Sequence, residues 1–295
     1  MPKQSKRLGL LWIVLAACGY GSMALFARLA YADGVDTTSL LALRFTLAAV
    51  VLGVWVRRQR IALPRGKDLW GFAGLGALFA SMAWTYFSAL HYASSGLVAL
   101  LVYVYPVMVA VLGALLGLDR FGRAETVALA ACAVGLYLLL GQSLHAGSPM
   151  GIVLALLSGL LYAIYILCNS RFGQGVHPLG AAWVVIVSAA VIDSLIAAGL
   201  HLTLPSSPTG WGALVALACF SSALANSAFL IGLRHVGPTL ASVLSTLEPV
   251  ITVSLGLAFL GESLSPSALA GSALVLSAAA GLALARARAP TARTA

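Results

Sequence analysis

The feature that most constrains this chain is a series of long apolar segments separated by short polar connections. A helix needs about 20 mostly apolar residues to cross the hydrocarbon layer of a membrane. Ten segments have this character, and their predicted bounds are Gly9–Ala30, Ser39–Val56, Leu69–Leu90, Ser95–Leu116, Ala124–Gly141, Met150–Ser170, Leu179–Leu200, Trp211–Leu233, Pro238–Leu260 and Pro266–Ala285. Only 8% of the 295 residues are charged, against about 25% in a soluble domain. The sequence therefore predicts an all-α polytopic membrane protein with ten transmembrane helices.

The positive charges predict how these helices are oriented. If the N-terminus is placed in the cytoplasm, all but two of the 17 Lys and Arg residues fall in cytoplasmic connections or tails. The two exceptions, Arg28 and Arg44, lie within the first two spans near their outer ends. The opposite connections carry Asp33, Asp36 and Glu262 but no Lys or Arg. Because cytoplasmic loops are enriched in cations, both termini are expected to be cytoplasmic.

The same charge distribution bears on the partners of the chain. The formal net charge is +9, but the cations lie in short loops and form no basic face with interleaved aromatic side chains. This pattern argues against nucleic acid as a partner and favours the lipid bilayer.

The two halves of the chain resemble each other around two prolines. When Pro106 is aligned with Pro249, the following valines coincide and Asp119 falls on Glu262. Each half holds five predicted helices. Because five is odd, the second half must be inverted in the membrane, which is an architecture of secondary transporters with midplane binding sites.

The opening helices of the halves also align, with Tyr20 on Tyr162. We predict a first five-helix repeat over residues 8–142, an inverted second repeat over residues 149–286, and a cytoplasmic tail over residues 287–295.

An acid and a proline lie side by side in the middle of the ninth predicted span, at Glu248 and Pro249. An acid at this depth is costly, so it is by default a candidate functional residue. Glu248 is predicted either to contact an ammonium group or to carry a proton, since a low dielectric favours the neutral carboxyl. The alternative is a protonated acid that hydrogen-bonds to Ser245 or to backbone groups freed by Pro249. Pro106 and Pro249 are expected to bend their helices as hinges, and simple helix curvature is the alternative.

Aromatic residues near the first proline suggest a binding wall. Tyr105 is the repeat counterpart of Glu248 and offers a ligand both a hydroxyl and a ring face. Together with Tyr103, Trp84 and Tyr86 it forms a candidate cavity lining. The alternative is that these aromatic residues belong to the membrane-interface belts, although Trp84 and Tyr105 lie in mid-span.

A second polar group falls on the sixth and eighth spans. Tyr162, Tyr165 and Asn169 are three and four residues apart, so they share one helical face and extend the candidate lining. Asn226 in the eighth span is a further candidate, for which polar contact between helices is an equal explanation.

Two charged residues in other spans are candidates as well. Asp193 is predicted to form an ion pair with Arg44 or Arg28, or to face an outer cavity. Arg44 alternatively attracts the carboxylate of a substrate.

Catalysis and cofactor binding have no support in the sequence. The four cysteines lie inside apolar spans without the spacing of metal ligands. There is no zinc-protease motif and no Walker A motif. We therefore expect no enzyme activity, no cofactor and no metal.

The motifs of both halves resemble the EamA-type domain of the drug/metabolite transporter superfamily, from Leu10 to Leu284. In the second half these are Ala228-Phe-Leu-Ile-Gly-Leu-Arg-His-Val-Gly-Pro, Leu247-Glu-Pro-Val, Leu260-Gly-Glu-Ser-Leu and Gly271-Ser-Ala-Leu-Val. In the first half they are Gly19-Tyr20-Gly21, Leu43-Arg44-Phe45, Ala89-Leu90-His91-Tyr92, Tyr105-Pro106-Val107 and Leu118-Asp119.

Three positions depart from that pattern. Tyr20 replaces a common tryptophan, Asp119 a usual glutamate, and Tyr105 a small or acidic residue. The resemblance implies a secondary transporter of a bacterial-type inner membrane that exports small metabolites. Within the family the chain is most similar to amino-acid exporters, including the aromatic-amino-acid type. The alternatives are export of drug-like amines or nucleotide precursors, and a membrane scaffold that transports nothing.

Overall fold

The computed structural model describes residues 3–89, 92–93, 98, 101–118, 122–140, 148–172, 175–200, 202–260 and 265–288. In these ranges the chain forms helices joined by short connections and contains no strand. The all-helical prediction is therefore confirmed. Asp119 and Glu262 lie outside the described residues.

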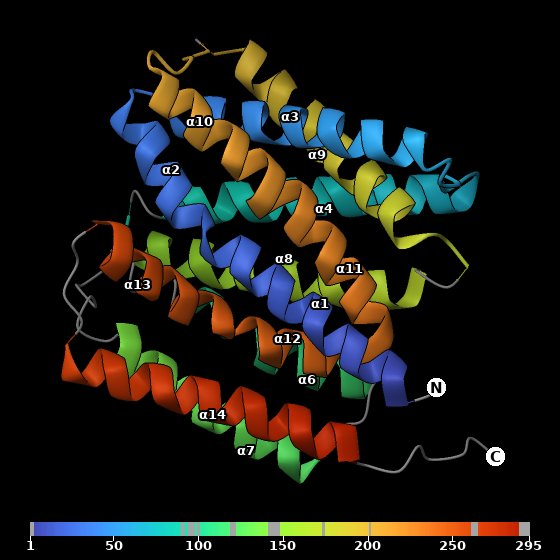
Figure 1. Ribbon diagram of the computed structural model, residues 1–295, viewed down its shortest axis with the longest axis vertical. Helices are drawn as coiled ribbons and strands as arrows, with labels where there is room; N and C mark the ends of the chain where they lie inside the picture. Colours follow the sequence, from blue (N-terminus) through green and yellow to red (C-terminus); the bar gives the residue numbers. More distant parts are fainter. Residues whose placement is uncertain are drawn as a thin grey trace.

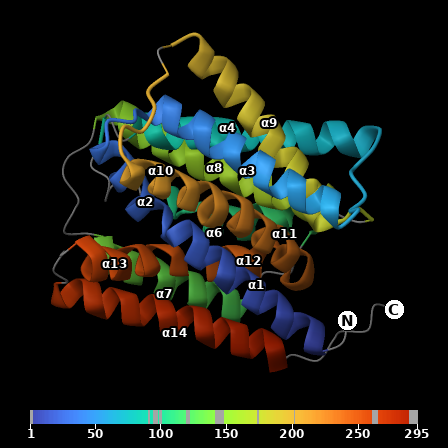
Figure 2. The same cartoon turned by 45° about the horizontal axis from the view of Figure 1, so that its top comes forward.

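The helices follow one another closely along the chain and lie side by side in space (Figures 1 and 2). They are α1 (Lys3–Gly21), α2 (Met23–Ala32), α3 (Thr37–Arg58), α4 (Lys67–Ala89), α6 (Tyr105–Leu115), α7 (Arg123–Leu140), α8 (Pro149–Phe172), α9 (Pro178–Ala198), α10 (Pro208–Ala216), the π-helical segment η2 (Leu217–Leu224), α11 (Ala225–Val236), α12 (Pro238–Ser245), α13 (Leu247–Leu260) and α14 (Pro266–Arg288).

Many of these helices are long enough to cross a membrane. Within the described residues, six helices have both the length and the apolar character that a crossing requires, with α1–α2 and α10–η2–α11 each taken as one. The 22 residues of α3 extend about 33 Å at 1.5 Å per residue, which matches a hydrocarbon layer of about 30 Å. The chain is thus a multi-pass membrane protein, and the number of ten crossings stays a prediction.

Prolines begin several helices. α8, α9, α10, α12 and α14 each start at a proline. The first N–H groups of a helix have no acceptor within it, so a residue without an N–H is tolerated there and its fixed φ suits the helix. These prolines explain why the second half divides cleanly into segments.

Four spans are interrupted instead of continuous. α1 and α2 are separated at Ser22, a turn at residues 103–104 precedes α6, Thr246 separates α12 from α13, and η2 interrupts α10–α11. The sequence predicted bends at Pro106 and Pro249. In the structure a new helix begins at Tyr105 and another at Leu247, so each proline lies in a first turn where its missing N–H costs no hydrogen bond. A hinge role for the two prolines stays a prediction.

The main helix contacts join one half of the chain to the other. α1 packs against α11, and its repeat counterpart α8 packs against α4. Three further pairs, α3 with α9, α6 with α12 and α7 with α14, join equivalent spans. The contact of α4 with α9 has its counterpart in the contact of η2 with α3. If each helix is replaced by its counterpart in the other half, the same set of contacts results, so the packing between the halves is symmetric.

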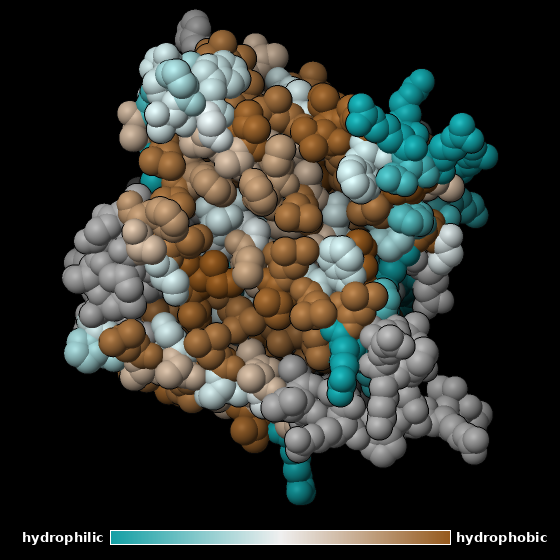
Figure 3. All heavy atoms as spheres, viewed as in Figure 1, coloured by the Kyte–Doolittle hydropathy of each residue, from teal (hydrophilic) through white to brown (hydrophobic). Residues whose placement is uncertain are grey.

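The surface agrees with a membrane environment. Large apolar side chains are exposed, with Leu115 at 77% and Phe259 at 70%, and the middle of the face in Figure 3 is mostly apolar. The exposed cations of residues 57–67 lie where α3 leads into α4. α1 begins and α14 ends on that same side of the molecule (Figure 1).

Hydrogen bonds join the connection between α2 and α3 to the connection between α9 and α10. The Asp33 carboxylate accepts hydrogen bonds from the Ser206 N–H at 2.7 Å, the Ser206 hydroxyl at 3.0 Å and the Ser207 N–H at 3.0 Å. Asp36 caps α3 through the Ser39 N–H at 3.0 Å and also accepts from the Thr203 hydroxyl. We call this contact between the halves the 33–36 clasp.

Candidate functional site

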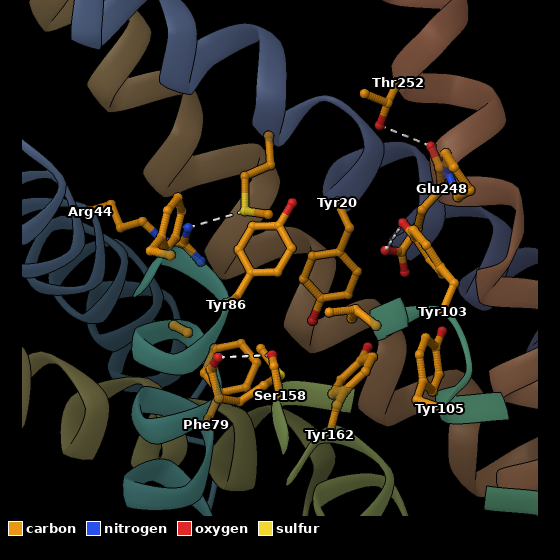
Figure 4. Close-up of a pocket in the computed structure, with 16 residues that line it drawn as sticks. Tyr20, Arg44, Phe79, Tyr86, Tyr103, Tyr105, Ser158, Tyr162, Glu248 and Thr252 are labelled. Carbon is orange, nitrogen blue, oxygen red and sulfur yellow. Dashed lines mark hydrogen bonds between the residues drawn. The ribbon is translucent and has the colours of Figure 1, made fainter. Parts of the chain in front are cut away.

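A cavity of about 190 Å³ lies where the interrupted helices meet. Its lining comes from both halves, through α1, α2, α3, α4, α6, α8 and α13 (Figure 4). Aromatic side chains dominate the lining: Tyr20, Phe79, Tyr86, Phe87, Tyr103, Tyr105 and Tyr162. An apolar wall with a small number of placed polar groups is typical of a small-molecule site.

Glu248 is the acidic group of this cavity. It lies in the first turn of α13, just beyond the interruption at Thr246, where the helix dipole favours negative charge. Its Oε2 accepts a long hydrogen bond of 3.4 Å from the Tyr103 hydroxyl. Its Oε1 is buried and has no hydrogen-bond partner. Glu248 therefore keeps acceptor capacity for a ligand.

The position of Glu248 depends on a close approach of α1 to α13. The Thr252 hydroxyl donates to the Gly21 carbonyl at 2.9 Å and to the Glu248 carbonyl at 3.0 Å. A Cβ atom at Gly21 would lie 2.8 Å from Ile251 Cβ and 2.9 Å from the Glu248 carbonyl oxygen. Only a glycine fits here without displacing α13.

Three tyrosines form one continuous edge of the lining. The ring centroids of Tyr105 and Tyr162 are 4.6 Å apart, and those of Tyr103 and Tyr105 are 6.1 Å apart. The Tyr105 hydroxyl donates to the Ser242 carbonyl at 3.5 Å. These contacts fix the rings, while their hydroxyl groups add polar character to an otherwise apolar wall.

Arg44 is the basic group of the cavity and enters it opposite Glu248 (Figure 4). Its side chain is only 4% exposed. Nη1 donates to the Met23 sulfur at 3.1 Å, and Nε has no hydrogen-bond partner. A thioether is a weak acceptor, so the guanidinium group retains strong donors for an anionic ligand.

The structure brings together only part of the predicted site. Of those candidates, Glu248, Tyr105, Tyr86, Tyr162 and Arg44 line the cavity, and Tyr103 joins them. Both prolines lie at the helix starts beside it, and Pro249 lines it as well.

Trp84 and Asp193 do not line this cavity. The Trp84 indole N–H donates to Asp193 Oδ1 at 2.8 Å, and Asp193 is fully buried. The predicted ion pair of Asp193 with Arg44 or Arg28 stays a prediction. The hydrogen bond between Trp84 and Asp193 has no signal in the sequence, because the two residues lie in different halves.

Tyr165, Asn169, Asn226 and Ser245 are buried behind the cavity wall. Tyr165 donates to Asn226 Oδ1 at 2.9 Å, and Asn169 Nδ2 donates to the Tyr165 carbonyl at 2.9 Å. Tyr165 and Asn169 follow Tyr162 on α8, but only Tyr162 lines the cavity.

Several lining residues were absent from the sequence prediction. The pattern marks Tyr20 only as the repeat counterpart of Tyr162, yet both line the cavity. Phe79, Phe87, Met23 and Met82 carry no signal beyond apolar character, which every span shares.

Comparisons with known proteins agree with this architecture. The sequence model of the EamA-like transporter family matches twice, over residues 7–141 and 149–284. A crystal structure superposes with a TM-score of 0.84 at 22% identity and covers 98% of this chain and 99% of its own, which shows a shared fold.

Three curated proteins illustrate the relatives of the chain. The uncharacterized transporter YcbK of Bacillus subtilis is 26% identical, covering 87% of this chain and 86% of its own. The uncharacterized inner membrane transporter YedA of Escherichia coli is 28% identical over 75% and 73% of the two chains. The threonine/homoserine exporter RhtA of Escherichia coli is 26% identical over 84% and 82%.

Proposed function

We propose, since the chain belongs to the EamA-like transporter family, that it is a secondary transporter that exports amino acids or related small metabolites by alternating access. The observation that carries the substrate class is the placement of Arg44 and Glu248 on opposite sides of one aromatic cavity. An α-amino acid presents a carboxylate and an ammonium group together with a side chain. Each of these parts meets complementary chemistry in this cavity.

The carboxylate of the substrate binds Arg44 in this proposal. A guanidinium group matches a carboxylate with paired donors, and the hydrogen bond from Arg44 Nη1 goes to the thioether of Met23, which is a weak acceptor. The ammonium group binds Glu248, whose Oε1 has no partner. Pairing both charges on one ligand offsets the cost of leaving them buried.

The tyrosines select the rest of the substrate. Tyr20, Tyr105 and Tyr162 offer ring faces and edges to a side chain, and aromatic pairs prefer offset or edge-on contacts. We infer a preference for amino acids with large apolar or aromatic side chains. RhtA, which exports threonine and homoserine by its name, is a related exporter of amino acids.

The mechanism we infer follows from the helix interruptions and from the symmetric helix contacts between the two halves. Interrupted helices at a repeat interface are the usual surroundings of a transporter site. Pro106 and Pro249 act as hinges at the starts of α6 and α13. The repeats are inverted and rock about the cavity, with the termini and the basic residues 57–67 in the cytoplasm.

Proton coupling through Glu248 is part of this proposal. A carboxyl that binds an ammonium group in one state and a proton in the other links export to the proton gradient. An exporter of drug-like amines is the second candidate, because Glu248 and the aromatic wall alone also suit a cation.

Counterflow in proteoliposomes tests the substrate class. Vesicles loaded with one unlabelled amino acid at a time are expected to accumulate the labelled form, most strongly for aromatic and large apolar amino acids. If no amino acid exchanges while an unrelated amine does, the amine exporter replaces the amino-acid exporter.

A further inference from the structure

We propose that a column of polar side chains, which starts at Tyr20 in the cavity lining and continues through the buried Asn226, Tyr165 and Asn169, is the closed limb of the solute path. This limb leads from the cavity toward the surface that carries Arg171 and Arg234. The inference rests on the proposed function only in assuming that a solute crosses the protein.

Hydrogen bonds join the column to the cavity. Tyr20 lines the cavity, and its hydroxyl lies 3.5 Å from Asn226 Oδ1. The same oxygen accepts from the Tyr165 hydroxyl at 2.9 Å, and Asn169 Nδ2 donates to the Tyr165 carbonyl at 2.9 Å. The column thus runs from α1 through α11 into the last turns of α8.

Two amide groups in this column keep unused hydrogen-bonding capacity. Asn226 is 1% exposed and Asn169 is 3% exposed. Asn226 Nδ2 and Asn169 Oδ1 are buried without a hydrogen-bond partner. A buried polar group left unpaired is costly, so these groups are better explained by a state in which water or solute reaches them.

A second pocket lies beyond the end of the column. It holds about 440 Å³ and is lined by Ser170, Arg171, Leu233 and Arg234, among others. Ser170 and Arg171 directly follow Asn169 in the sequence. On α11, Asn226, Leu230 and Arg234 are spaced four apart, so they form one stripe that spans about 12 Å.

The charge of this second pocket suits the proposed solute. Arg171 is exposed, and Arg234 is partly buried with Nη1 donating to the Val176 carbonyl. Two guanidinium groups at its rim attract a carboxylate, so a solute meets cationic groups before the polar column and Arg44 after it.

The alternative is that these polar side chains only hold α8 and α11 together and never meet the solute. Contacts of that kind stabilise helix packing when their groups are satisfied. Here one oxygen accepts from two tyrosines while the Nδ2 of the same amide has no partner. A sealed contact stays closed to solvent, whereas a path opens from the side of Arg171 and Arg234.

Cysteine accessibility distinguishes the two. The four native cysteines are replaced by alanine or serine, and single cysteines are then introduced as Asn169→Cys, Leu230→Cys and Ala163→Cys. Ala163 is the matched control, since it is 0% exposed on α8 but about a third of a turn away from Asn169 around the helix. A membrane-impermeant anionic methanethiosulfonate, which the two guanidinium groups attract, is applied from the side that carries Arg171, with Arg57→Cys as the exposed reference.

We expect Asn169→Cys to react from that side, with Leu230→Cys as the second variant should the first not fold. An open state populated at about 0.1–10% lowers the rate about 10- to 1,000-fold below the Arg57→Cys reference. Ala163→Cys stays unreacted. If neither path variant reacts, or if Ala163→Cys reacts equally fast, the path is excluded.

This labelling needs no substrate, so its outcome is separate from that of counterflow. Labelling without amino-acid exchange rejects the substrate and keeps the path. Exchange without labelling rejects the path and keeps the substrate.

Discussion

Arg44 of α3 and Glu248 of α13 line one cavity from opposite sides, with tyrosine side chains between them (Figure 4). Neither side chain forms an ion pair with the other, and each keeps an unpartnered polar atom, Nε of Arg44 and Oε1 of Glu248. Opposite charges held apart in a cavity are the arrangement that a zwitterion requires.

Glu248→Gln is expected to weaken binding of the ammonium group and to abolish dependence on a pH gradient. A hydrogen bond to a charged group contributes about 1.5–3 kcal/mol, which corresponds to about a 10- to 100-fold rise in the apparent Kd. Counterflow and gradient-driven uptake in proteoliposomes measure both effects. Asp68→Asn, at an exposed acid in the first turn of α4, is the matched control, and unchanged gradient-driven transport in Glu248→Gln would remove Glu248 from the proton role.

Arg44→Gln is expected to impair amino acids and spare amines. Its loss removes a charge-assisted contact to the carboxylate, worth about 10- to 100-fold in apparent affinity, while an amine without a carboxylate makes no such contact. Competition between labelled amino acid and its amine analogue measures the difference, with the exposed Arg57→Gln as control. An equal loss for both ligands would show that Arg44 serves the fold and not the carboxylate.

Tyr103→Phe removes the only hydroxyl that donates to the Glu248 carboxylate among the described residues. The contact is long at 3.4 Å, so we expect an effect of about 0.5–1.5 kcal/mol, or about 2- to 10-fold in apparent affinity. Tyr137→Phe, at a residue 59% exposed, should leave transport unchanged. A loss in Tyr103→Phe as large as that in Glu248→Gln would contradict this ranking.

Gly21→Ala is expected to displace α1 from α13 and to lower the melting temperature in detergent. The added Cβ meets Ile251 Cβ at 2.8 Å and the Glu248 carbonyl at 2.9 Å, and overpacking costs about 1–3 kcal/mol. Gly71→Ala is the matched control, because its added Cβ meets no atom within 4 Å. Equal melting temperatures for the two variants would show that α13 can move away from α1 without a loss of stability.

Asp33→Ala is expected to destabilise the 33–36 clasp at neutral pH and to matter less in acid. Hydrogen bonds from the Ser207 N–H and from Ser206 lower the pKa of Asp33 below its usual value of 3.8. A carboxyl whose pKa is lowered by folding contributes stability above its unfolded pKa, and this contribution is lost as the pH falls through the folded value. Melting curves of the wild-type protein and of Asp33→Ala at pH 7 and near pH 3 test this. A difference in melting temperature that is larger near pH 3 than at pH 7 would contradict the prediction.

The sequence predicted the charged parts of the site better than the aromatic ones. Glu248 and Arg44 stand out because a charge within an apolar span is costly and needs a reason. Phe79 and Phe87 carry no such signal, because aromatic side chains are equally stable facing lipid, core or cavity. Which of them face the cavity depends on how α4 is rotated against α8, and that follows from packing between the halves.

The fold was predictable in outline and not in its interruptions. Length and hydropathy indicate where the helices lie. The interruption at Ser22 has no proline to mark it, and its position follows from the contact of Gly21 with α13. Trp84 was expected in the aromatic lining, but it lies outside this cavity and donates a hydrogen bond to Asp193. Local sequence does not predict this contact, because the two residues lie in different halves.

Binding of three matched ligands to the purified protein measures whether one cavity recognises both ends of a zwitterion. These are an aromatic amino acid, its decarboxylated amine and its deaminated acid. We predict that the amino acid binds about 10- to 100-fold more tightly than either analogue, because each analogue leaves one buried charge without its partner. Equal or tighter binding of the amine would show that the cavity does not recognise the carboxylate.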